Sequence, residues 1–148
     1  MWCTDGPHGI RPEVLWDEWE QAGWTNDSCT AFPALTCLAA TWNPEMSALY
    51  GKSIGEEARY REKDILLGPG VNIYRTPLNG RNFEYMGEDP FLSARMVVPY
   101  IREVQKNGVA ACVKHFALNN QEQNRLYHDV VVDDRALHEI YLPAFKAA

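Results

Sequence analysis

The sequence predicts an α/β fold built around a parallel β-sheet. Short apolar runs of strand length alternate along the chain with longer stretches in which apolar residues recur at helical spacing. Polar clusters follow the apolar runs at the points where strands would end. This alternation is typical of βα units, whose strands pair in parallel. No internal repeat, low-complexity tract or Ser/Gly linker divides the 148 residues, so we expect one continuous domain segment.

The first clear helix is expected to begin after Asn43. Asn is a favourable N-cap, Pro44 suits the first helical position, and Glu45 complements the positive end of the helix dipole. The apolar residues that follow recur at helical spacing and should face the core: Met46, Leu49, Tyr50, Ile54 and Ala58. The pattern therefore predicts an amphipathic helix.

A buried strand and a long loop are expected next. Residues 64–73 form a short apolar run punctuated by Gly and Pro, which predicts a strand that enters a tight loop. A segment rich in Asn, Gly and Pro follows, from residue 74 to residue 90. A loop of this length would be unusual in a compact domain unless it had a functional role.

A second helix is predicted from about Asp89 to Asn107. Asp89 is a suitable N-cap, Pro90 suits the first position, and Gly108 ends the pattern. The apolar residues of its inner face are Leu92, Met96, Val97, Tyr100, Ile101 and Val104. Pro99 should kink or break this helix, because its ring removes a backbone donor and crowds the preceding turn.

The last part of the chain repeats the order of strand and helix. Residues 108–113 are a second apolar run of strand length, and a polar loop follows at 119–129. A short extended piece at 130–132 leads to a final helix capped by Asp133 or Asp134. The residues expected to point inward are Leu137, Ile140, Tyr141, Ala144 and Phe145.

Composition excludes several classes of function. The formal net charge is −6, and the 14 Lys and Arg residues are scattered among 20 acidic residues. We therefore expect no nucleic-acid partner, which would require a basic face. The longest apolar runs, such as Ile65–Leu67, are far too short to span a bilayer, so no membrane association is expected.

The four cysteines predict no metal site, and we expect no cofactor. Cys3, Cys29, Cys37 and Cys112 form neither a CxxC pair nor a Cys/His cluster at zinc spacing. We expect free thiols or small packed side chains, and spacing leaves a Cys29–Cys37 disulfide open as the alternative.

Candidate ligand-binding residues lie where the predicted strands end, because the carboxyl ends of parallel strands share one rim. Asp5 stands in an Asp-Gly-Pro turn, Arg81 in the long loop, and Lys114 and His115 directly after the second strand. Arg125, in the polar loop, either reaches inward or stays solvated. A carboxylate can accept two hydroxyl hydrogens, and an Arg fork offers several donors. Together they suit a neutral, polyhydroxylated ligand.

Each of these residues also has a purely structural interpretation. Asp5 could bond its own backbone within the turn. Arg81 could form a salt bridge with Glu84. Lys114 could extend into solvent while His115 bonds a nearby backbone group. Local pattern alone does not decide between these alternatives.

The ordered motifs resemble family 3 of the glycoside hydrolases. The stretches that match its pattern, in order along the chain, are 5–11, 32–33, 40–43, 67–73, 75–90, 114–116 and 120–122. The resemblance covers nearly the whole chain. It implies a partial TIM-like (β/α) barrel, about the first half of the family's catalytic domain. Residues 1–148 would then be part of a single barrel domain, truncated at both ends.

The resemblance also implies a retaining, exo-acting enzyme for β-linked sugars. The family residues that hold the terminal sugar map onto Asp5, Arg81, Lys114 and His115, and Arg125 is carried over with them. Ala117 follows where the N-acetylglucosaminidase branch has a Pro-Gly-His stretch, which favours the β-glucosidase or β-xylosidase type.

No catalytic residue maps onto this chain. Retaining hydrolysis requires two carboxylates about 5–5.5 Å apart, and the family's Ser-Asp-Trp-like nucleophile motif does not occur in the 148 residues. A complete barrel takes roughly 250 residues, so we expect about four of its eight strands here. We expect no turnover by the chain alone, and marginal stability or self-association through exposed barrel edges. A non-catalytic carbohydrate-binding or degenerate truncated module is the alternative.

Overall fold

A parallel sheet of three strands underlies the part of the chain that the computed structural model describes, residues 1–7, 9–11 and 28–148. β1 (Cys3–Asp5), β2 (Ile65–Leu67) and β3 (Ala110–Ala111) lie in the order β1-β2-β3, and both pairs are parallel. The predicted α/β fold with a parallel sheet is confirmed. Within the described ranges three strands are present where we expected about four, because residues 130–132 lie mostly exposed and join no ladder.

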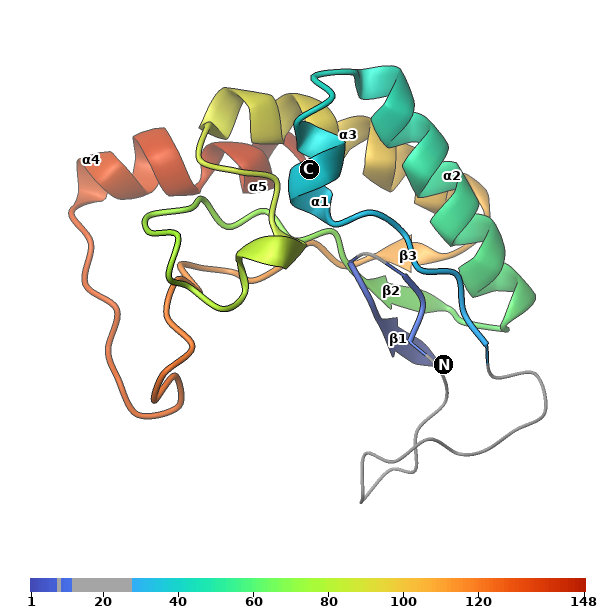
Figure 1. Cartoon of the computed structure of the whole chain (residues 1–148), viewed down its shortest axis with the longest axis horizontal. Coiled ribbons are helices and arrows are strands. Elements are labelled where there is room, and N and C mark those ends of the chain that lie inside the picture. The colour runs from blue at the N-terminus through green and yellow to red at the C-terminus, as the bar shows by residue number, and fades with distance from the viewer. Residues whose placement is uncertain (8, 12–27) are drawn as a thin grey trace.

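Strand alternation gives the sheet two different faces. Thr4 and Leu66 are register partners, and both are buried against the helices, at 5% and 0% exposure. Side chains one residue away point to the opposite face, which carries Asp5 and the exposed Cys112. Figure 1 shows the helices gathered on one side of the strands and the long loops beyond the strands' carboxyl ends. The face of the sheet that carries Asp5 is therefore the one that the helices leave open.

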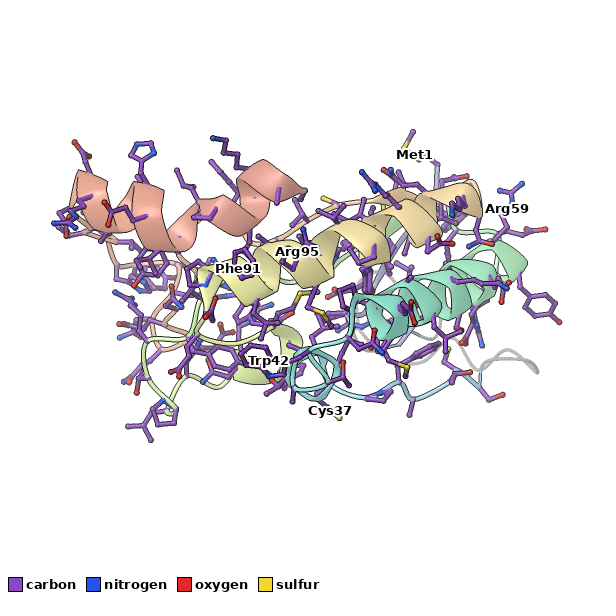
Figure 2. All side chains as sticks on the ribbon, turned by 90° about the horizontal axis from the view of Figure 1, so that it is seen from above. Met1, Cys37, Trp42, Arg59, Phe91 and Arg95 are labelled. Atoms are coloured by element: carbon purple, nitrogen blue, oxygen red, sulfur yellow. The ribbon has the colours of Figure 1, made fainter. Side chains whose placement is uncertain are left out.

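The helical layer consists mainly of two long helices, α2 (Pro44–Tyr60) and α3 (Pro90–Lys106). The shorter helical elements are α1 (Leu35–Ala39), a 3₁₀ turn (Asn82–Glu84), α4 (Asp134–Ala136), a π turn (Leu137–Tyr141) and α5 (Pro143–Ala147). Figure 2 looks down on this layer and shows α3 between α2 and the C-terminal helical segment.

The helix α2 begins as predicted but buries a different stripe. The Asn43 side chain accepts a hydrogen bond from the Glu45 backbone N–H at 2.9 Å. Tyr50, Ile54 and Ala58 are buried, whereas Met46 and Leu49, expected to be inward, are 44% and 55% exposed. The face that contacts α3 is instead completed by small residues, namely Ser47, Gly51 and Gly55. They let the two helices approach closely: a Cβ added at Gly51 would lie 2.3 Å from the Tyr100 carbonyl oxygen.

Pro99 was expected to kink or break the helix α3, and the helix runs through it without a break. Asp89 caps the helix, accepting from the Leu92 N–H at 2.9 Å. The carbonyl that loses its helical donor to Pro99 belongs to Arg95, which is exposed on the outer side of the helix (Figure 2), where water can replace that donor. Met96, Val97, Tyr100 and Val104 are fully buried, as expected for the inner face.

The C-terminal segment is helical from Asp134 but is interrupted before Pro143. Asp133 is the cap, accepting from the Ala136 N–H at 2.9 Å. The Leu142 N–H then bonds the Leu137 carbonyl, which widens this turn into a π helix and lets α5 start at Pro143. Tyr141 and Ala144 are buried as predicted, whereas Ile140 is 37% exposed, because the π turn shifts the register of the inward face.

Two further expectations concern disulfide bonds and membrane-spanning helices. None of the four cysteines takes part in a disulfide, so the Cys29–Cys37 bond left open by the sequence does not form. Of the helices within the described ranges, none combines the length and the apolar character needed to cross a membrane.

Candidate functional site

The sheet brings Asp5 and Lys114 together at its carboxyl rim. Asp5 is the last residue of β1, and its Oδ1 accepts from the Gly6 N–H at 2.9 Å. Lys114 follows β3, and its backbone is held by Gly70 and its neighbours: the Lys114 N–H bonds the Pro69 carbonyl and the Lys114 carbonyl accepts from Val71. The Lys114 Nζ lies 2.6 Å from Asp5 Oδ1. Both side chains are therefore positioned by the backbone at the carboxyl ends of the strands.

Glu84 joins Lys114 to Arg81. Its side chain is 3% exposed, and its Oε2 lies 3.4 Å from the Lys114 Nζ. Its Oε1 accepts from the Nε of Arg81. The 3₁₀ turn at Asn82–Glu84 places Arg81 and Glu84 three residues apart on one side of the loop. The expected Arg81–Glu84 salt bridge is thus present, but it forms part of the rim cluster and does not draw Arg81 away from it.

His115 packs against the same cluster through both ring nitrogens. The Arg81 Nη2 lies 3.2 Å from His115 Nε2, and the Tyr85 hydroxyl lies 2.9 Å from Nδ1. Asn72 holds the His115 backbone: its Oδ1 accepts from the His115 N–H at 2.8 Å, and its Nδ2 donates to the His115 carbonyl at 3.1 Å. The Lys114–His115 peptide bond is cis. Both side chains of the pair reach the cluster, as a shared ligand would require.

Burial and neighbouring charges set the ionisation of two rim residues. Burial would raise the pKa of Asp5, but the hydrogen bond and charge of Lys114, with the charge of Arg11 and the Gly6 N–H, outweigh it and lower the pKa below 3.8. Burial, together with the charges of Lys114 and Arg81, outweighs the Glu84 carboxylate and lowers the pKa of His115 to about 4. At neutral pH the site therefore holds a charged Asp5 beside an uncharged imidazole.

Arg125 lies at the periphery of this cluster. Its Nε is 3.6 Å from Glu122 Oε1, and both side chains are 46% exposed. Glu122 Oε2 is in turn 3.6 Å from the Arg81 Nη1. Among the residues that the structure describes, Arg125 is thus linked to the rim through Glu122 alone, in contrast to Asp5, Arg81, Lys114 and His115, which the structure brings together.

Residues in the described ranges form no group of three or more side chains suited to hold a metal ion. The cluster instead presents carboxylate oxygens and nitrogen donors side by side. Asp5 retains 35% side-chain exposure, while Lys114 is 11% exposed and Glu84 is 3% exposed. A ligand at the rim would consequently meet Asp5 first, with the cations positioned behind it.

Comparison with known proteins identifies the family of this chain. The model of the glycosyl hydrolase family 3 N-terminal domain matches residues 7–148. The chain belongs to glycosyl hydrolase family 3. The resemblance seen in the motifs is therefore confirmed, and the fold is that of a partial (β/α) barrel of this family.

Individual relatives show how much of a family 3 enzyme the chain represents. It is 75% identical over its whole length to a β-glucosidase of Bacteroides ovatus, of which it spans 20%. It is 45% identical to an exo-α-(1→6)-L-arabinopyranosidase of Bifidobacterium breve, of which it spans 19%. The structure of β-glucosidase 3B from Thermotoga neapolitana in complex with glucose matches 98% of the chain and 20% of that protein, with a TM-score of 0.88 and 46% identity. The chain thus spans about a fifth of these relatives.

Sequence reasoning missed several residues that position the family 3 rim. It weighed Glu84 only as a competitor for Arg81, and it assigned no role to Asn72, Tyr85 or Asn119. Asn72 could have been found, because it follows the apolar run of β2 much as Lys114 follows that of β3. No comparable signal marked Asn119, which contacts the site only because the loop after β3 folds back onto Tyr85.

Proposed function

We propose that residues 1–148 form the sugar-binding part of a β-glucosidase site, in which Asp5, Arg81, Lys114 and His115 bind the terminal sugar of a β-linked glycoside. Arg125 borders this site through Glu122. The observation that supports the proposal most directly is the contact of Lys114 with Asp5 and Glu84, which joins side chains from three separate segments into one polar rim.

The chemistry of the rim suits a neutral sugar. The Asp5 carboxylate can accept hydrogens from two adjacent hydroxyls, and Lys114 and Arg81 can donate to hydroxyl oxygens. The carboxylates of Asp5 and Glu84 balance the charges of Lys114 and Arg81, so these four side chains together carry no net charge that would favour an anion over a neutral ligand. Such paired groups select a ligand by the directions and the number of the hydrogen bonds that it can form with them.

The parent protein would complete the reaction. The 148 residues contain no Ser-Asp-Trp-like motif, and a retaining mechanism needs a nucleophile and an acid/base. We infer that this chain contributes substrate binding and that the two catalytic carboxylates belong to the rest of a family 3 enzyme. The relatives named above include β-glucosidases of Bacteroides ovatus and Thermotoga neapolitana, and this favours glucose as the terminal sugar.

Binding of glucose by the purified chain tests the proposal. We expect chemical-shift changes on titration with glucose, and about a tenfold weaker affinity in Lys114→Ala, because one charge-assisted hydrogen bond is lost. Lys52→Ala is the matched control, since Lys52 pairs only loosely with Glu56, at 3.8 Å, and is 58% exposed. Absence of glucose binding in the folded wild-type chain, or equal affinity in both variants, would overturn the assignment.

Hydrolysis assays test whether the catalytic carboxylates lie outside this chain. We expect no release of the aryl group from aryl β-glucoside or aryl β-xyloside by the isolated chain. Turnover that disappears in Lys114→Ala would contradict the inference that the catalytic carboxylates lie outside these 148 residues.

A further inference from the structure

The hydrogen-bond partners of His115 determine which of its nitrogens carries the proton. The ring contacts Arg81 Nη2 at Nε2, at 3.2 Å, and the Tyr85 hydroxyl at Nδ1, at 2.9 Å. A guanidinium has only N–H donors and does not lose its charge in proteins. The contact with Arg81 is therefore a hydrogen bond only if Nε2 offers a lone pair. The single ring proton then resides on Nδ1.

The Tyr85 side of the ring fits the same assignment. Tyr85 receives a hydrogen bond from the Asn119 Nδ2 at 3.1 Å and can donate its own proton to the Asn119 carbonyl at 3.4 Å. Burial, aided by the Glu84 charge, raises the pKa of Tyr85, so its hydroxyl keeps that proton. With its proton directed at Asn119, the Tyr85 oxygen is free to accept from the Nδ1–H of His115. Each donor then faces an acceptor, from Arg81 through His115 and Tyr85 to Asn119.

We propose that His115 is held as the neutral, Nδ1-protonated tautomer, that Tyr85 and Asn119 are positioning residues which hold it so, and that Nε2 is a hydrogen-bond acceptor for a ligand hydroxyl. The last part rests on the proposed sugar-binding function, whereas the tautomer does not. A hydroxyl that enters between Arg81 and His115 would replace their direct hydrogen bond, accepting from Nη2 and donating to the lone pair of Nε2 that is thereby released. His115 and Arg81 would thus read both the donor and the acceptor character of one hydroxyl group.

This arrangement also explains why the ring lies between a cation and a phenol. A protonated imidazole would present donors at both nitrogens and leave the Arg81 contact without an acceptor. It would also add a positive charge beside Lys114 and Arg81. The low pKa of His115 agrees with this electrostatic cost. The site therefore favours one of three protonation forms of the ring.

Nitrogen NMR of the ligand-free chain tests the tautomer directly. The chain has four histidines, and His115→Gln identifies the signals of His115 among them. Two-bond correlations at pH 7 should show Nδ1 as the protonated nitrogen and Nε2 as the unprotonated one. This tautomer is the less populated form of a free imidazole in water, so partial unfolding would not produce it. A protonated Nε2, or a doubly protonated ring, would overturn the proposal.

Removal of the Tyr85 hydroxyl tests the positioning role. In Tyr85→Phe the Nδ1–H loses its acceptor, and we expect about a fivefold fall in the ratio of the Nδ1–H to the Nε2–H form. Tyr60→Phe is the matched control, because Tyr60 lies at the end of α2 and is 83% exposed. An unchanged ratio in a folded Tyr85→Phe variant would overturn the role of Tyr85 and leave Arg81 as the sole determinant.

Monofluorinated glucoses test the acceptor role and separate it from the proposed function. Fluorine cannot donate a hydrogen bond, so replacement of the hydroxyl that faces Nε2 should weaken binding at least tenfold in the wild type and much less in His115→Ala. If glucose itself does not bind, the proposed function fails while the NMR result on the tautomer stands. If every fluorinated sugar binds like glucose, the acceptor role of Nε2 is wrong.

Discussion

The ammonium group of Lys114 lies 2.6 Å from the carboxylate of Asp5, although 109 positions separate the two residues. The parallel sheet makes this contact possible, because β1 and β3 flank β2 and end at the same rim. The ion pair spans β2 and ties the two outer strands together. Since Lys114 also contacts the buried Glu84, the residue that we assign to sugar binding also neutralises the interior of the rim.

We expect Lys114→Met to destabilise the chain measurably. The substitution keeps most of the apolar stem but leaves Glu84, at 3% exposure, with Arg81 as its remaining cationic partner among the described residues. Loss of one partner of a buried pair costs about 3–5 kcal/mol, and the 35% exposure of Asp5 reduces this to about 2 kcal/mol. Urea unfolding monitored by circular dichroism gives the value. Lys52→Met should change stability by less than about 0.5 kcal/mol, and equal effects would contradict the argument.

A single added methyl group at Gly70 should disturb the loop beneath the site. A Cβ at Gly70 would lie 2.2 Å from the Glu84 carbonyl oxygen and 2.8 Å from the Tyr85 ring, both of which belong to the rim. We expect Gly70→Ala to lower the free energy of unfolding by about 1–3 kcal/mol and to weaken glucose binding. Gly80→Ala is the control in the same loop, because a Cβ there meets nothing within 4 Å. Similar losses in both variants would count against close packing at Gly70 as the cause.

The sequence predicted the elements and the rim better than it predicted their packing. The caps at Asn43 and Asp89 could be predicted because capping depends on residues that are neighbours in the sequence. Each of the two side chains accepts a hydrogen bond from a backbone N–H, as expected. Met46 and Leu49 were misplaced because hydrophobic periodicity favours large apolar residues, whereas α2 meets α3 through Ser47, Gly51 and Gly55. Small residues at a helix contact leave no hydrophobic signal.

In the candidate site, too, local sequence signals identified the residues, whereas their tertiary contacts could not be predicted. Strand ends and motif order pointed to Asp5, Arg81, Lys114 and His115, and the structure brings these four together. The bridging role of Glu84 depends on the 3₁₀ turn that directs its two oxygens toward different cations. That geometry is tertiary, so residue type and spacing do not reveal it.

Acid should destabilise the chain in two separate pH ranges. His115 has a pKa of about 4 in the folded chain against an ordinary value of 6.5, so the unfolded chain binds more protons between these values and the free energy of unfolding falls as pH drops from about 6.5 to about 4. The groups that act on the ring are Arg81, Lys114, Glu84 and Asp5. Asp5 has a lowered pKa, so its contribution is present above 3.8 and is lost as pH falls through the lower, folded value.

Urea unfolding at a series of pH values checks the first range. His115→Gln should flatten the dependence between about pH 6.5 and pH 4, since glutamine does not titrate. His138→Gln is the control, because His138 is exposed on the π turn. A slope that is equally steep in wild type and in His115→Gln would mean that another group causes the dependence.

The open sheet edge should promote association of the chain. Within the described ranges neither β1 nor β3 has a second strand neighbour, and unpaired edges are templates for pairing with another copy. Large apolar side chains beyond the strands are exposed as well, including Phe116 at 78% and Val131 at 86%. We expect sedimentation velocity to show concentration-dependent oligomers. Ala110→Lys, which places a charge on exposed β3, should raise the monomer fraction severalfold.

A charge elsewhere on the surface should not have this effect. Gln105→Lys adds the same charge on the exposed side of α3, outside the strands, and should leave the oligomer distribution close to that of the wild type. If both variants dissociate the oligomers equally, net charge and not the edge of β3 governs association. A wild-type chain that stays monodisperse at all concentrations and melts cooperatively as a monomer would contradict the prediction altogether, because the exposed edge and side chains would then be stable in water without a partner.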